Sequence, residues 1–489
     1  MWHQKILRGI TIFSAVWILR LGTGLLTSAC LYRYFGPSLM GLLAVGSSVL
    51  GLISFIVIET DVVVVPRLAG SGSPQAAHRI VWSNYLIKAV CRLLVGLLMF
   101  AVAGAAQTFY GFEGLREIIV ALGIVQIVGI AASPIGPEVL QGLLQYRRYL
   151  WQAVLMMAAQ IGAAAYTILT HQGVIGYILC GAVGDLVVSA YNWGLYAGIR
   201  RTLGWKDAPI GYSVVWSDAI SLTQRSIPVS LNQILYKSYL NMGTLFAGKW
   251  FSTVTIGHLS FALNVVNKVN SAVNTMVSTA FLPVFGELKE RARNELEELY
   301  ERGYHTVLLL TAVATVLLAV FARQIALLLG GPEYLPAATL LQLLTVQLIF
   351  RVPLQILRML YLSMEKTWTL LAIFFVKSAC EIVLFFSLAP WLGAKGIVLA
   401  QVLSYVVYAI GFGQLGLRFL YADRYLRQLM AFGRDLIAVA ALVGGAIAVN
   451  AWVEPSLAAS VGLALVSLML ASAWLWLASG QKRIFVLGR

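Results

Sequence analysis

The chain has 489 residues, of which 60% are hydrophobic and only 11% charged, and its formal net charge is +15. Soluble domains carry about 25% charged residues, so this composition excludes a soluble protein. No single basic segment concentrates the positive charge, which argues against a nucleic-acid-binding surface.

Apolar stretches long enough to cross a bilayer recur along the whole chain. A spanning helix needs about 20 apolar residues, and backbone without water must satisfy its hydrogen bonds within a helix. The sequence therefore predicts an all-α polytopic membrane protein with about 14 transmembrane helices. The predicted spans are 10–32, 38–58, 81–104, 118–137, 149–170, 173–197, 227–248, 253–283, 305–328, 336–361, 367–389, 394–417, 436–452 and 457–478.

Loop charges predict the orientation of these spans. With the N-terminus in the cytoplasm, most Lys and Arg residues between spans fall on the inside. The outside loops then hold only Arg33, Arg116, Lys249, Arg323 and Lys395. Cytoplasmic loops collect basic residues, so we expect both termini in the cytoplasm and an even number of spans.

Weak internal similarity at an offset of about 216 residues indicates two halves in parallel orientation. Gly136-Pro137 corresponds to Val352-Pro353, and the glycines at 173 and 176 correspond closely to those at 393 and 396. We predict an N-terminal six-helix lobe (1–200), a cytoplasmic linker (201–225), a C-terminal six-helix lobe (226–420) and two additional transmembrane helices (436–478). Such repeats are typical of transporters that bind substrate between their halves.

Charged residues remain inside the predicted spans. The basic ones are Arg20, Lys88, Arg92, Lys237, Lys268, Arg351, Arg358 and Lys377. The acidic ones are Asp185 and Glu381, with Glu59 and Asp61 at the end of the second span. A charge at the centre of a spanning helix costs about 2.5–3.5 kcal/mol, so it faces water or a partner. Lys377 and Glu381, four residues apart, are expected to pair. Lys88 and Arg358 lie near span ends, where snorkelling to headgroups is the alternative.

Polar residues at helical spacing accompany two of these lysines. The eighth span carries a stripe that includes Asn264, Asn267, Lys268 and Asn274, and the seventh carries Gln233, Lys237 and Asn241. Amides often join helices, but the lysines favour the wall of a hydrated cavity. Cationic and amide side chains suit a phosphate joined to sugars. We therefore predict substrate binding by Arg20, Arg92, Lys237, Lys268, Arg351 and the amides Gln233, Asn241, Asn264, Asn267 and Asn274, and ion coupling by Glu59, Asp61 and Asp185.

Several loop motifs resemble those of the multidrug/oligosaccharidyl-lipid/polysaccharide (MOP) superfamily. They are Tyr34-Phe-Gly-Pro-Ser-Leu-Met-Gly41, Val65-Pro66-Arg67, Gly330-Gly-Pro-Glu-Tyr-Leu-Pro-Ala-Ala338, Glu365-Lys366 and Gly393-Ala-Lys-Gly396. Within the superfamily the chain resembles O-antigen-type polysaccharide flippases over roughly residues 5–420. The resemblance implies a V-shaped, MATE-like fold with two lobes around a central cavity. Flippases of lipid-linked cell-wall precursors carry cavity arginines in the first and seventh helices, and Arg20 and Lys237 match these places.

The resemblance also implies a cargo and a location. The cargo would be an undecaprenyl-pyrophosphate-linked oligosaccharide for O-antigen or exopolysaccharide, moved across the bacterial inner membrane. Membrane lipids and a polysaccharide polymerase or glycosyltransferases are the expected partners of a monomer. We expect no nucleic acid and no cofactor. The alternatives are a lipid II-type flippase, a cation-coupled drug exporter and, more distantly, a membrane glycosyltransferase or polymerase, which would need a larger soluble loop.

Overall fold

A computed structural model describes residues 2–71, 73–205, 212–288, 293–351, 353–364, 367–421 and 425–452, with 460, 461, 463–467, 469 and 470. These residues form helices joined by short turns, and no strand occurs among them. Eight of their helices are long and apolar enough to cross a membrane, and a ninth candidate is a pair bent by 43°. The prediction of an all-α polytopic membrane protein is confirmed, whereas the number fourteen stays a prediction.

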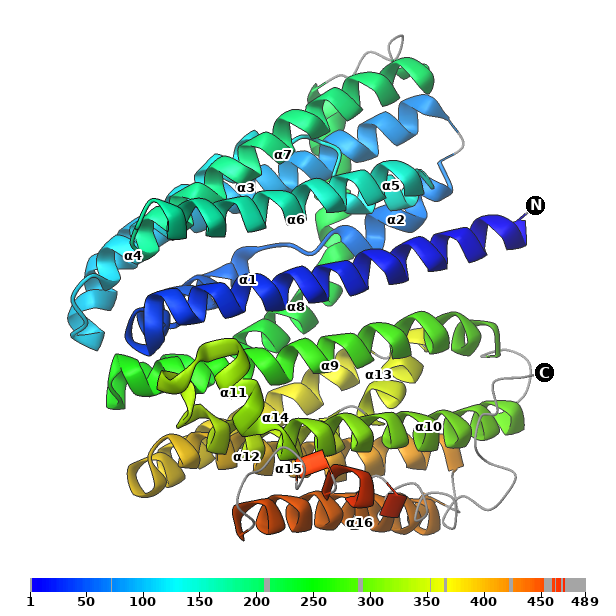
Figure 1. The fold of residues 1–489 in the computed structure, drawn as a ribbon. Coiled ribbons are helices and arrows are strands. Elements are labelled where there is room, and N and C mark those ends of the chain that lie inside the picture. Colours follow the sequence, from blue (N-terminus) through cyan, green and yellow to red (C-terminus); the bar gives the residue numbers. More distant parts are fainter. Residues whose placement is uncertain are drawn as a thin grey trace. The chain divides into compact units, whose positions relative to one another are not determined.

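The chain divides into two compact units, Met1–Val254 and Thr255–Arg489, called unit 1 and unit 2 below. Figure 1 shows their elements. Unit 1 contains α1 (Trp2–Ile53), η1 (Ser54–Ile56), α2 (Asp61–Ala69), α3 (Pro74–Tyr110), α4 (Leu115–Val128), η2 (Gly129–Ala131), α5 (Pro137–Gly142), α6 (Tyr146–Leu169), α7 (Val174–Thr202) and α8 (Tyr212–Trp250). The predicted linker 201–225 overlaps the start of α8, and α8 packs against α1 and α3 within unit 1.

Unit 2 holds nearly all of α9 (Thr253–Leu288) and every later helix. These are α10 (Arg293–Val320), α11 (Ala322–Gly330), η4 (Pro332–Tyr334), α12 (Ala337–Arg351), α13 (Pro353–Ser363), α14 (Thr367–Leu392), α15 (Ala394–Tyr421) and α16 (Tyr425–Trp452). Helix α16 corresponds to the thirteenth predicted span and packs against α10, α12 and α15. Most of the fourteenth span, 457–478, lies outside the described residues.

The first two predicted spans form one continuous element, α1, with a sharp kink. Gly36 adopts φ 69° and ψ 176°, and Pro37 follows it. A residue with a side chain rarely adopts positive φ, and proline cannot continue the hydrogen bonds of the preceding turn. The two arms of α1 meet at this kink, at the place where the sequence predicts a loop between spans.

Glycines bring α3 and α4 into close contact. A Cβ atom at Gly96 of α3 would lie 2.6 Å from Ile127 Cγ1 and 3.1 Å from the carbonyl oxygen of Gly123. A Cβ at Gly123 would in turn lie 3.2 Å from the carbonyl oxygen of Gly96. Lipid is as apolar as a leucine side chain, so helices in a membrane associate through tight packing of small residues. The α3–α4 contact therefore depends on the absence of side chains at both positions.

Replacing Gly96 by leucine should separate α3 from α4. We expect Gly96→Leu to lower the free energy of unfolding by about 1–3 kcal/mol, the usual cost of overpacking, seen as a lower melting temperature of the purified protein. Gly104→Leu is the matched control, because no atom lies within 4 Å of a Cβ at this other glycine of α3. Equal melting of both variants would contradict the packing argument.

Candidate functional site

Two helical segments of unit 1 are interrupted. Residues 57–60 are non-helical between η1 and α2, and residues 132–136 are non-helical between η2 and α5. The second interruption contains Pro134 and is closed by Pro137 at the first turn of α5. Proline lacks the N–H that a helix interior requires. Because irregular backbone at membrane depth needs polar partners within the protein, polar side chains are expected beside these breaks.

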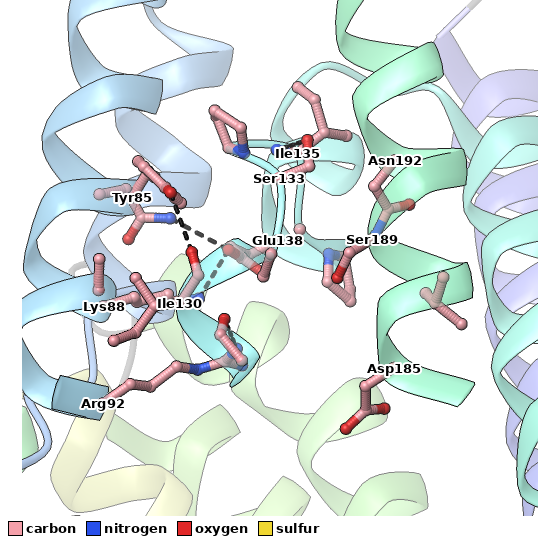
Figure 2. A pocket seen from close by; sticks show the side chains of 18 of the residues that line it. Tyr85, Lys88, Arg92, Ile130, Ser133, Ile135, Glu138, Asp185, Ser189 and Asn192 are labelled. Atoms are coloured by element: carbon pink, nitrogen blue, oxygen red, sulfur yellow. Dashed lines mark hydrogen bonds and ion pairs between the residues drawn. The ribbon is translucent and has the colours of Figure 1, made fainter. Parts of the chain in front are cut away.

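Helix α3 supplies those partners from two residues one turn apart. Lys88 Nζ donates to Asp61 Oδ1 at 2.8 Å and to Glu138 Oε1 at 2.6 Å. Asn84 Nδ2 donates to Glu138 Oε1 at 3.0 Å, and the Thr60 hydroxyl donates to Asn84 Oδ1. We call Thr60, Asp61, Asn84, Lys88 and Glu138 the hinge node, because they tie both interruptions to α3. Figure 2 shows two of its members, Lys88 of α3 and Glu138 of α5.

The hinge node is partly shielded from solvent. The side chain of Glu138 is 7% exposed, and that of Lys88 is 31% exposed. A carboxylate buried without a partner destabilises a fold strongly, whereas a well-bonded pair offsets its desolvation. A Cβ at position 136 would collide with the Glu138 carboxylate, so a side chain there would displace this carboxylate from its present position. The node therefore fixes the position of both chain breaks.

A cavity of about 190 Å³ opens beside the hinge node, entirely within unit 1. Figure 2 shows Tyr85, Lys88 and Arg92 of α3 on one wall and Asp185, Ser189 and Asn192 of α7 on the opposite wall. The interrupted chain lies between these walls. We call this cavity the N-terminal pocket.

Hydrogen bonds hold the walls of the N-terminal pocket in place. Arg92 Nη1 donates to the carbonyl oxygen of Gly129, and the Tyr85 hydroxyl donates to that of Ile130 at 3.0 Å. Gln152 Nε2 donates to Asn192 Oδ1 at 3.0 Å. Thus α3 binds the carbonyl oxygens at the end of the interrupted helix, while α6 and α7 are joined across the pocket.

The N-terminal pocket carries balanced charge. Its lining includes two cations, Lys88 and Arg92, and two carboxylates, Glu138 and Asp185. Asp185 faces the same space as Arg92 (Figure 2). The structure thus brings together Arg92, predicted from sequence as a substrate ligand, and Asp185, predicted as an ion-coupling residue. A polar pocket with an accessible carboxylate suits a proton or a small cation better than an anion.

Unit 2 contains a second set of charges, which we call the C-terminal charge cluster. Arg351 Nη1 donates to Asn267 Oδ1 at 3.0 Å, which joins α12 to α9. Lys377 Nζ binds Glu381 Oε2 at 2.7 Å within α14, which confirms the predicted pair. The ring centroid of Tyr405 on α15 lies 5.5 Å from Arg351 Cζ and 4.3 Å from Lys377 Nζ. Cations over a tyrosine face are stabilised by its ring quadrupole.

Burial and charge distinguish this cluster from the N-terminal pocket. Arg351 is 2% exposed, and Lys377 and Glu381 are each 1% exposed. Among the described residues the cluster contains two cations, Arg351 and Lys377, and one carboxylate, Glu381. The Ser404 hydroxyl donates to Glu381 Oε2 at 3.2 Å, while Glu381 Oε1 has no hydrogen-bond partner among the described residues. Unit 2 therefore holds a group of charged side chains below its surface.

The other predicted site residues that the structure describes differ in their exposure and local contacts. Arg20 and Asn264 are exposed, and Glu59, Asn241, Lys268 and Asn274 are half-buried. Arg20 Nη2 lies 4.0 Å from Met156 Sδ, and the Glu59 N–H donates to Ser230 Oγ at 2.9 Å. The side chains of Gln233 and Lys237 lie outside the described residues. A shared cavity between the two halves stays a prediction.

Sequence reasoning missed Glu138 and the bonding role of Lys88. Glu138 lies one residue beyond the fourth predicted span. For Lys88 the sequence left open whether the side chain bonds a partner or snorkels to lipid headgroups. The available signal was the run Pro134 to Glu138, in which two prolines and a glycine precede an acid, together with Asn84 and Lys88 four residues apart on another helix. Only the tertiary fold brings these segments together.

Comparisons with known proteins identify relatives of this architecture. A family model described as polysaccharide biosynthesis protein matches residues 31–339, and one described as lipid II flippase MurJ matches residues 233–468. No curated protein matches the chain.

Solved structures match the fold over most of the chain. An inward-facing multidrug resistance MATE family transporter of the MOP superfamily has a TM-score of 0.68 at 15% identity, covering 85% of this chain and 98% of its own. Lipid II flippase MurJ in an inward closed conformation has a TM-score of 0.68 at 12% identity, and the match covers 95% of this chain and 99% of its own. A MOP superfamily transporter from Pyrococcus furiosus has a TM-score of 0.52 at 16% identity, and the match covers 85% of this chain and 96% of its own. The chain has the fold of MOP superfamily transporters.

Removing the cation of the hinge node should destabilise unit 1. We expect Lys88→Met to lower the free energy of unfolding by up to about 3 kcal/mol, because it leaves Glu138 unpaired in a shielded site. The second substitution in Lys88→Met/Glu138→Gln should recover part of this loss. Thermal melting of the purified variants measures both effects.

Arg302→Gln is the matched control for the hinge node. It breaks an ion pair with Glu298 in which both side chains are exposed, and such pairs contribute about 0–1 kcal/mol. If Lys88→Met and Arg302→Gln melt alike, the hinge node does not stabilise the interruptions.

Proposed function

Because the chain belongs to the polysaccharide biosynthesis protein family, we propose that it is a flippase for an undecaprenyl-pyrophosphate-linked oligosaccharide. It carries this lipid from the cytoplasmic to the outer leaflet of the bacterial inner membrane, with both termini in the cytoplasm. The product supplies O-antigen or exopolysaccharide assembly. The observation that carries the proposal is the family match over residues 31–339 on a MOP-type fold.

The charges of unit 2 support a phosphate-bearing cargo. Arg351, Arg358 and Lys377 are nearly inaccessible in α12, α13 and α14. Cations at membrane depth are costly and mark the paths of substrates and ions. Arginine binds two phosphate oxygens at once through its planar guanidinium. The half-buried Lys268 and Asn267 on α9 add a cation and an amide suited to a glycosyl phosphate.

Alternating access is the transport mechanism that we propose. The two halves expose a central site first to the cytoplasm and then to the opposite side, and the lipid tail stays in the bilayer. Arg20, Lys237, Lys268 and Arg351 contact the pyrophosphate in this scheme. No step requires a bond to be made or broken in the cargo.

A lipid II-type precursor is the second candidate cargo. The match of residues 233–468 to the lipid II flippase family favours it, and its pyrophosphate would use the same cations. A cationic drug fits less well, because two of the three charged side chains described in the C-terminal charge cluster are cations. The sugar recognised by the amide residues separates the two lipid cargoes.

Loss of the cavity cations should stop surface polysaccharide production. We expect Arg20→Ala, Lys237→Ala and Lys268→Gln each to reduce complementation of a flippase-deficient strain by tenfold or more, since each removes a charge-assisted bond to phosphate of about 1.5–3 kcal/mol. Surface polysaccharide is measured at equal membrane levels of protein. Arg116→Ala, at an exposed arginine of α4, is the control. Wild-type polysaccharide in Arg20→Ala and Lys237→Ala cells would rule out the cargo contact.

We further propose that Asp185 couples transport to a proton or sodium gradient. It is an accessible carboxylate in the N-terminal pocket, facing Arg92 rather than a bonded lysine. Asp185→Asn keeps the size of the side chain but removes the titratable group. We expect this variant to lose gradient-dependent flipping in proteoliposomes, and Glu113→Gln, at an exposed acid outside the pocket, to retain it. Flipping that persists in Asp185→Asn after both gradients collapse would refute the coupling role.

A further inference from the structure

A separate basic cavity lies within unit 1, among α2, α3 and α8. It has a volume of about 120 Å³, and its polar lining is Arg67, Arg79, Ser83 and Asp218. None of these residues belongs to the N-terminal pocket or to the predicted cargo site. The loop charges place Arg67 and Arg79 on the cytoplasmic side.

The charges around this basic cavity do not cancel. Arg79 Nε binds Asp218 Oδ2 at 2.8 Å. Arg225 lies two turns beyond Asp218 on the same face of α8. Burial lowers the pKa of Arg67, the nearby charge of Arg225 lowers it further, and Asp218 partly opposes both effects. Three guanidinium groups thus share one carboxylate, which Arg79 already holds.

Arg67 and Arg225 have bonding capacity to spare. Within the described parts of unit 1, neither side chain forms an ion pair with, or donates a hydrogen bond to, another residue. Their mutual repulsion is relieved when an anion lies between them. Guanidinium groups match the oxygens of a phosphate in pairs. The N-terminus of the 37-residue helix α3 adds a partial positive charge, since Ala76 of its first turn lines the cavity.

We propose that Arg67, Arg79 and Arg225 form a binding site for a phosphate group at the cytoplasmic end of unit 1, distinct from the path of the transported lipid. Two sources provide this chemistry on that side of the membrane, an anionic lipid headgroup and a soluble phosphate. In both cases the anion joins α2 to α8 through their arginines. The site goes beyond the proposed function, because it concerns a ligand that is held rather than moved.

The test uses the full-length protein in phosphatidylcholine nanodiscs. In one arm phosphatidylglycerol is added, and native mass spectrometry counts the molecules that stay bound. In the other arm inorganic phosphate is titrated, and the rise in melting temperature reports binding. Arg67→Gln and Arg225→Gln should each weaken binding about tenfold, the effect of losing a charge-assisted hydrogen bond. Asp218→Asn should strengthen binding, because it removes the competing carboxylate.

Arg201→Gln is the matched control, since this exposed arginine ends α7 on the same predicted side of the membrane but outside the cavity. A response to phosphatidylglycerol alone identifies a headgroup site, and a response to phosphate alone identifies a soluble ligand. The proposal is overturned if Arg67→Gln and Arg225→Gln bind both probes like the wild type, if Arg201→Gln weakens binding equally, or if Asp218→Asn weakens it. Surface polysaccharide is measured in parallel in cells that carry the same variants. Loss of phosphate binding and loss of polysaccharide production are thus scored separately, so failure of this proposal is distinguishable from failure of the proposed function.

Discussion

The double ion pair of Lys88 is the interaction on which the architecture of unit 1 depends. A lysine within a spanning helix is tolerated only with partners or water, and Lys88 takes its partners from two different interrupted segments, Asp61 and Glu138. Each carboxylate begins a short helix, α2 or α5, and these two helices also pack against each other. One cation therefore pairs with two acids and fixes where both chain breaks lie relative to α3.

The N-terminal pocket follows from these breaks. At the break between η2 and α5, the carbonyl oxygens of Gly129 and Ile130 accept hydrogen bonds from the side chains of Arg92 and Tyr85, and that of Gly129 also accepts one from the Ala132 N–H. The missing turn leaves the space that α7 faces with Asp185. Discontinuous helices in transporters commonly create binding sites in this way, because irregular backbone is stable only where it lines a cavity or contacts protein.

Local patterns in the sequence predicted the fold class and one of the charge pairs. Hydropathy predicted the helices, and the spacing of Lys377 and Glu381 predicted their ion pair, since residues four apart share a helix face. The partners of Lys88 lie 27 and 50 residues away, so no local period reveals them. Hydropathy also ended the fourth span just before Glu138, because a proline-rich break resembles a loop. The proposed binding roles of Arg20, Lys268 and Arg351 require contact with one cargo from two units, and helical spacing within one element does not determine such an arrangement.

The two units differ in how they balance buried charge, and this difference bears on their roles. In the N-terminal pocket the cations are matched by carboxylates, so a proton or a small cation changes the local balance while a large anion gains little. Among the described residues of the C-terminal charge cluster, Arg351 and Lys377 lie with one carboxylate, that of Glu381, and in the proposed scheme these cations attract the phosphate. The proposed coupling of a cation to the transport of an anionic lipid uses both environments. In the proposed scheme the cation binds within unit 1, whereas cations of both units contact the lipid, so the two ligands interact differently with the two units, as a conformational change requires.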